Sequence, residues 1–136
     1  MAQKIDFETS YTEQQLELLN KMEAVCNKAK ELEENSHGYV VAGHDGAGTD
    51  YCYCGEGKGY KGAPLRPSCI WAVVFNTEEE ALNKVRELTG CRNGYGHEIK
   101  LDVMVAWYYF SLVRSQMLGS IDVTKRMFQE INNNKI

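Results

Sequence analysis

The sequence lacks the surplus of basic residues that is typical of proteins that bind long nucleic acids. Its 15 lysines and arginines are outnumbered by 19 aspartates and glutamates, which gives the 136 residues a formal net charge of -4. Binding to a duplex is dominated by neutralisation of phosphates, so long nucleic acid is not an expected partner. A small anion is still compatible with this charge, because a few cations can cluster locally on an acidic protein.

Long apolar runs are also missing. The longest, residues 103–110, is far shorter than the roughly 20 residues needed to span a bilayer. The first residues contain no apolar stretch of the kind found in a secretory signal. We therefore expect no membrane partner and a cytoplasmic location.

Neither a disulfide framework nor a zinc pattern is present. The five cysteines are odd in number, and cysteines of a cytosolic chain are reduced by default. Side chains of zinc-ligand type occur at His44, Cys52, Cys54 and Cys69, but the Cys52-Tyr53-Cys54 spacing is that of an alternating strand and lacks the knuckle of a structural zinc site. We expect small core side chains there, with no metal and no cofactor.

The apolar pattern of the first half predicts one long helix followed by strands. Apolar side chains recur at steps of three and four over about residues 11–35, behind two pairs with capping-box spacing, Ser10 with Glu13 and Thr12 with Gln15. Residues 39–42 and 51–54 are expected to form a hairpin, and the continuous apolar run at 69–75 a central buried strand.

The second half is predicted to be helical. Thr77 and Glu80 form a capping box for a short helix that ends at Gly90. Residues 97–118 alternate as a strand does, yet their length favours a central helix, which Gly119 would end before a last helix capped by Ser120 or Asp122. The expected fold is a single α+β domain over residues 1–136, with a small antiparallel β-sheet packed with a long N-terminal helix and C-terminal helices.

The clearest binding chemistry lies in the glycine-rich loop at residues 91–97. It combines one cation, one amide, one aromatic ring and one imidazole, supplied by Arg92, Asn93, Tyr95 and His97. If a helix follows, its unsatisfied N–H groups would attract an anion to the loop. Arginine can grip a phosphate and the rings can stack on a base, although the alternative is that the glycines only satisfy turn geometry.

A second glycine-rich loop at residues 55–62 carries Lys58 and Lys61 as mobile charges. Neither loop contains a Walker sequence or a strand-linked G-x-G-x-x-G, so classical nucleotide-binding folds are not indicated.

Two further residues are candidates for ligand contacts. Arg114 lies in a nearly uncharged apolar segment, and its partner could be a carboxylate such as Asp102 of another copy, a ligand phosphate or solvent. Phe75 ends the expected central strand, where an aromatic ring belongs to the core or lines a pocket.

In the order of its elements, the chain resembles the phage Thoeris anti-defence proteins. These act as sponges that sequester cyclic ADP-ribose signals and, in some members, cyclic oligonucleotides. The matching features are the long helix at 11–35, the sheet segment at 69–76, the capped helix after it and the apolar helix that reaches Arg114.

The resemblance implies a homo-oligomer, a dimer or a hexamer built from dimers, in the host cytoplasm. Its signal would be held by aromatic stacking and arginine contacts and released intact. Phe75, Arg92, Asn93 and Arg114 would surround an adenine and its phosphates, and the loop from Lys58 to Arg66 would form a second nucleotide site.

We therefore expect a phage anti-defence protein that binds and sequesters small cyclic nucleotide signals without cleaving them. The expected ligand-binding residues are Phe75, Arg92, Asn93, Tyr95, His97, Arg114, Lys58, Lys61 and Arg66. One alternative is a small inhibitor that binds a host defence protein directly. The other is a hydrolase that uses Cys91 and His97, although their six-residue separation is no catalytic signature.

Overall fold

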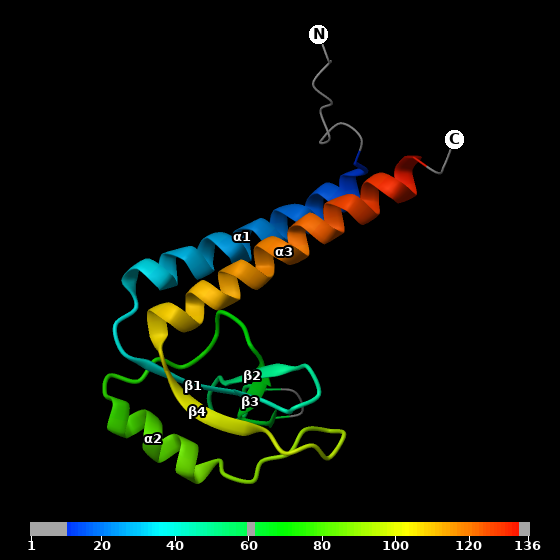
Figure 1. Ribbon diagram of the computed structural model, residues 1–136. Helices are drawn as coiled ribbons and strands as arrows, with labels where there is room; N and C mark the ends of the chain where they lie inside the picture. The colour runs from blue at the N-terminus through cyan, green and yellow to red at the C-terminus, as the bar shows by residue number, and fades with distance from the viewer. Residues whose placement is uncertain (1–10, 60–61, 134–136) are drawn as a thin grey trace.

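The computed structural model describes residues 11–59 and 62–133. The described elements are α1 (Glu13–Asn35), β1 (Tyr39–His44), β2 (Asp50–Tyr53), β3 (Leu65–Pro67), α2 (Glu78–Glu87), β4 (Lys100–Val105) and α3 (Ala106–Asn133) (Figure 1). The four strands form one antiparallel sheet in the order β3-β2-β1-β4. The expected α+β class, with an N-terminal and a C-terminal helix on an antiparallel sheet, is confirmed.

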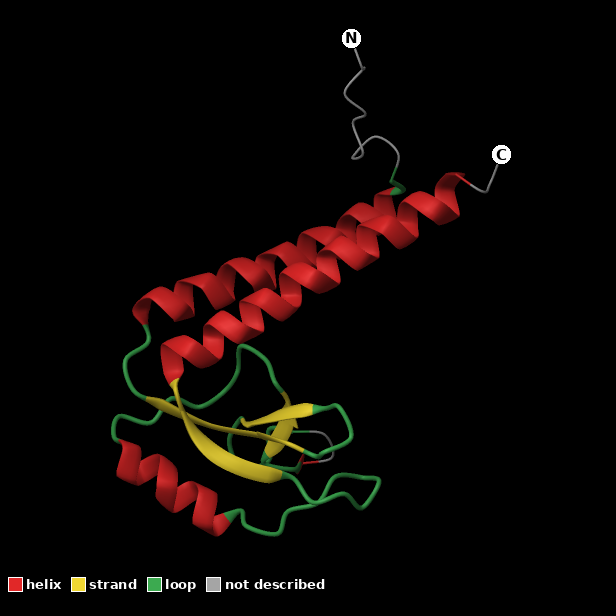
Figure 2. Ribbon diagram, viewed as in Figure 1, coloured by secondary structure: helices red, strands yellow, loops and turns green. Residues whose placement is uncertain are grey.

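The two long helices form an antiparallel pair on one side of the sheet. α1 and α3 lie side by side along their length, and their far ends extend beyond the strands as an arm (Figure 1). α2 covers the opposite face (Figure 2). Within the described part of the chain, no helix combines the length and apolarity needed to cross a membrane.

The alternation of side chains along β1 explains the two apolar layers. Val40 and Ala42 are buried against the α1–α3 helix pair, whereas Val41 is buried on the α2 face. Successive residues of a strand point to opposite faces, so one short central strand supplies both clusters. Cys52 and Cys54 are buried too, as expected of core side chains.

The starts predicted for the first helix and for the short helix after Thr77 are confirmed. Thr12 caps α1: its hydroxyl accepts from the backbone N–H of Gln15 at 3.1 Å, and its own N–H donates to the Gln15 side chain at 2.9 Å. Thr77 caps α2 by accepting from the N–H of Glu80 at 3.2 Å. Each cap satisfies backbone donors that the first helical turn leaves unpaired.

The central strand expected at residues 69–75 was wrong. This segment is irregular and touches the sheet through an isolated bridge between Phe75 and Tyr39. β2 and β4 already pair with β1, and β3 takes the outer edge of β2. The run is apolar because it wraps the end of the sheet: Ile70 and Val74 pack on the first cluster, and Val73 packs on the second.

The helix expected at 97–118 was wrong in its first part, and its end at Gly119 was wrong as well. Residues 100–105 form β4, which accounts for the strand-like alternation, and α3 begins only at Ala106. α3 then continues through Gly119 to Asn133, so Ser120 and Asp122 lie inside it and start no separate helix. Ile121 is buried beyond the glycine, and packing against α1 offsets the low helix propensity of glycine.

Candidate functional site

A cavity of about 330 Å³ opens where the loop at residues 91–97 meets β3. Three of the expected ligand-binding residues, Arg66, Arg92 and Asn93, line it together. Apolar side chains of Tyr51 and Ile99 contribute to its wall. We refer to this space as the basic cavity.

Arg92 supplies an available cation at the rim of the basic cavity. Its side chain is exposed, and Nη1 donates to the carbonyl oxygen of Gly96 at 2.6 Å. That single contact holds the side chain against its own loop and leaves guanidinium N–H groups for an anion. Arginine has five such donors in a planar fork that matches a phosphate.

Asn93 holds the loop in shape. Its Nδ2 donates to Oδ2 of Asp45 at 3.0 Å and to the hydroxyl of Tyr51 at 3.4 Å. Its Oδ1 accepts from the backbone N–H groups of Tyr95 and His97, both at 3.0 Å. An amide side chain has two donors and two acceptor positions, so these contacts use all of them. Asn93 therefore positions Arg92 and has no spare group for a ligand.

Arg66 joins the basic cavity to the other face of the sheet. It is half-buried, and its guanidinium carbon lies 4.8 Å from the centroid of the Trp71 ring. Its positive charge also contributes to lowering the pKa of Cys69. The cation thus has an aromatic partner within the chain.

The other loop residues that were expected to bind the ligand are not among those that line the cavity. Tyr95 is 89% exposed at the loop tip, and the side chain of His97 is also exposed. Lys58 is exposed in the other glycine-rich loop, and Lys61 lies outside the described residues. The loop at 91–97 leads to a strand, so the helix N-terminus that was expected to attract an anion there is absent.

Phe75 and Arg114 lie elsewhere. Phe75 stacks on Tyr53, with ring centroids 5.9 Å apart and an interplanar angle of 24°, and packs on the α2 face. Arg114 binds Glu33 of α1, with Nε 2.6 Å from Oε2 and Nη2 3.3 Å from Oε1. Its partner is therefore a carboxylate of its own chain rather than Asp102 of another copy. Neither residue lines the basic cavity.

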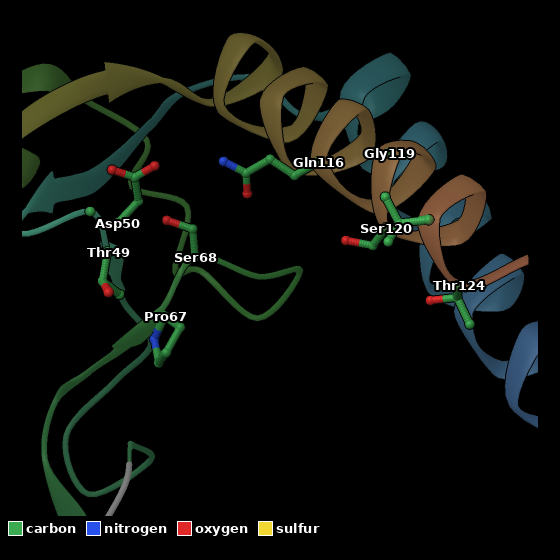
Figure 3. Close-up of a pocket in the computed structure, with 10 residues that line it drawn as sticks. Thr49, Asp50, Pro67, Ser68, Gln116, Gly119, Ser120 and Thr124 are labelled. Atoms are coloured by element: carbon green, nitrogen blue, oxygen red, sulfur yellow. The ribbon is translucent and has the colours of Figure 1, made fainter. Parts of the chain in front are cut away.

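A second space, which the sequence did not indicate, is a cleft of about 730 Å³ between α3 and the edge of the sheet. Figure 3 shows Asp50 and Ser68 on the sheet side facing Gln116 and Ser120 on α3. A smaller cavity of about 200 Å³ continues it toward His44, and Asp50, Ser68 and Gln116 line both. These ordinary polar residues carry no sequence signal, since only the fold brings the segments together.

The groups of the suggested hydrolase are not joined in the described residues. Cys91 is half-buried and lines the basic cavity, whereas His97 is exposed, and no hydrogen bond connects their side chains there. No group of three histidine, cysteine, aspartate or glutamate side chains in the described part of the chain is arranged to hold a metal ion.

Comparison with known proteins gives no matching family model, no matching curated protein and no matching solved structure. The candidate site therefore rests on two structural features, the basic cavity and the cleft between α3 and the edge of the sheet.

Proposed function

We propose that the protein is a phage anti-defence protein that binds a small cyclic nucleotide in the basic cavity and sequesters it without cleaving it. The ligand class is a cyclic ADP-ribose isomer or a small cyclic oligonucleotide. The observation that carries the proposal is a cavity with apolar walls that Arg66 and Arg92 both line. Cations bind phosphates, and apolar or aromatic walls accept a base.

The size and lining of the basic cavity support a ligand of this class. Its volume of about 330 Å³ lies at the lower end of the range found for small-molecule sites. The loop that carries Arg92 is already fixed by Asn93, so little ordering is needed on binding. An acidic chain with a local pair of arginines is suited to a small anion and poorly suited to long nucleic acid.

Direct titration of the purified protein tests the proposal. We expect cyclic ADP-ribose or a cyclic dinucleotide to bind, and Arg92→Ala to weaken binding by about tenfold or more, the effect of losing one charge-assisted contact. The matched control is Arg86→Ala, because Arg86 is an exposed arginine of α2 whose side chain donates to Asn83 and does not line the basic cavity. Equal affinity of the Arg92 variant and wild type would rule out the basic cavity as the site.

Recovery of the ligand separates sequestration from catalysis. The complex is heated, and the released molecule is identified by mass spectrometry. An intact cyclic nucleotide is expected, also from the Cys91→Ala variant. A cleaved product that disappears in this variant would favour the hydrolase instead.

We also propose that the protein is a homo-oligomer, a dimer or a hexamer. The support is a set of exposed apolar side chains on α3, of which Val123, Met127 and Ile131 lie four residues apart on one stripe. Surfaces of this kind usually have a partner. Native mass spectrometry measures the assembly: a monomer at micromolar concentration would contradict it, and tight capture of a host defence protein on this stripe would favour the inhibitor function.

A further inference from the structure

Two cysteine thiols face each other between β2 and the irregular segment that follows β3. The Sγ atoms of Cys52 and Cys69 are 3.9 Å apart. Cys52 is fully buried in the middle of β2, whereas Cys69 is half-buried. The pair therefore combines a half-buried cysteine with a fully buried one.

The contact is held in place by Tyr109 of α3. Its hydroxyl accepts from the backbone N–H of Cys69 and donates to the carbonyl oxygen of Cys69, both at 2.9 Å. Tyr109 is itself buried and packs edge-on against Phe110, with ring centroids 5.1 Å apart. Because both backbone groups of Cys69 are fixed to a core helix, its side chain stays directed at Cys52.

The surroundings of the two sulfurs differ. The hydrogen bond between the two sulfurs lowers the pKa of Cys69, and the backbone N–H of Trp71 and the charge of Arg66 lower it further. The same contact, together with burial, raises the pKa of Cys52. Cys69 is therefore the thiol of the pair that loses its proton more readily, and a thiolate is the reactive form of cysteine.

We propose that Cys52 and Cys69 are a peroxide-sensitive pair that closes to an intramolecular disulfide. In the first step the Cys69 sulfur attacks hydrogen peroxide, the O–O bond breaks, and a sulfenic acid and water form. The Cys52 sulfur then attacks the sulfenic sulfur and expels a second water. Two thiols and one peroxide give one disulfide and two waters, so the two electrons lost by sulfur reduce the peroxide.

The other cysteines have different surroundings. The Cys54 thiol donates to the carbonyl oxygen of Pro64 at 3.3 Å. Cys26 is a buried residue of α1, and Cys91 packs on the α2 face of the sheet. Within the described residues no other pair of cysteine sulfurs makes a contact like that between Cys52 and Cys69.

The experiment treats the full-length, reduced and folded protein with a small excess of hydrogen peroxide, and then unfolds it in denaturant and alkylates the remaining thiols. Of the five thiols, three are expected to stay reactive, and peptide mapping is expected to find Cys52 linked to Cys69. Cys69→Ser should abolish the disulfide, whereas Cys54→Ser and Cys91→Ser should retain it. Far-UV circular dichroism checks that each variant is folded.

Two results would overturn the proposal. One is a disulfide in the wild-type protein that joins a different pair, such as Cys54 and Cys69. The other is oxidation of Cys69 to the sulfinic or sulfonic acid while Cys52 remains free to be alkylated. Both are read from the wild-type protein alone, so they do not depend on the folding of a variant.

Discussion

The side-chain amide of Asn93 donates to Oδ2 of Asp45 at 3.0 Å, and this bond joins two loops that are 48 residues apart in the sequence. The other carboxylate oxygen of Asp45 accepts from the N–H groups of Ala47 and Thr49 at 2.8 and 3.1 Å. The hydrogen bond from Ala47 is the largest contribution that lowers the pKa of Asp45. The bond from Thr49 and the charge of His97 lower it further. Asp45 and Asn93 together fix the two loops, and with them the rim of the basic cavity.

Replacing Asn93 by alanine should lower the free energy of unfolding by about 1–3 kcal/mol, because several partners lose their hydrogen bonds at once. The matched control is Asn83→Ala, since the Asn83 side chain accepts from Arg86 on the exposed face of α2. We expect a change of less than about 0.5 kcal/mol in the control. Urea unfolding measures both changes. Equal losses of stability in the two variants would show that the hydrogen bonds of Asn93 between the loops do not stabilise the fold.

Local patterns predicted the features that depend on neighbours in the sequence. The caps at Thr12 and Thr77 are each formed with a residue three positions later, so spacing alone reveals them. The hairpin of β1 and β2 follows in the same way from two short apolar runs around a glycine-rich turn.

Features that depend on distant segments could not be predicted. An apolar run reports burial but not strand pairing, which is why residues 69–75 were expected to form a strand. Residues 97–118 contain first a strand period and then a helix period, and choosing one for the whole segment also misplaced a helix N-terminus beside Arg92. The Glu33 partner of Arg114 is 81 residues away, a separation over which no local pattern operates.

The ion pair of Arg114 and Glu33 should make stability depend on pH. The hydrogen bond from Arg114 lowers the pKa of Glu33 below its ordinary value of 4.5 in the folded protein. When the pKa of a carboxyl group is lower in the folded than in the unfolded protein, its ionisation stabilises the native state at pH values above the unfolded-state pKa. This contribution is lost as the pH falls through the folded-state pKa.

The Glu33→Gln variant tests this pH dependence. The variant should be less stable than wild type at about pH 7, and the difference should shrink as the pH approaches about 3. Urea unfolding at several pH values measures the difference. A gap of constant size would mean that ionisation of Glu33 does not matter, and Glu17→Gln, at an exposed pair with Lys21, serves as the control.

Tyr109→Phe removes the hydroxyl that bonds both backbone groups of Cys69 at 2.9 Å. Burial is the main reason that the pKa of this tyrosine is raised, so its partners are also shielded from water. We expect a loss of about 1–3 kcal/mol in the free energy of unfolding. Tyr108→Phe is the control on the adjacent, exposed residue, with an expected change of less than about 0.5 kcal/mol. Similar values for the two variants would contradict the anchoring role of Tyr109.

Gly119→Ala should stabilise the protein, which tests whether α3 is continuous. Gly119 lies inside the helix, and a methyl group added there would meet no atom within 4 Å beyond the neighbouring backbone of its own helix. Alanine in a helix interior is favoured over glycine by about 0.5–1 kcal/mol, so the free energy of unfolding should rise by about that amount. If α3 instead ended at Gly119 with a left-handed residue, as its sequence position suggests, alanine would be strained and the variant less stable. Urea unfolding therefore distinguishes the two conformations by the sign of the change, and far-UV circular dichroism checks that the helical content is kept.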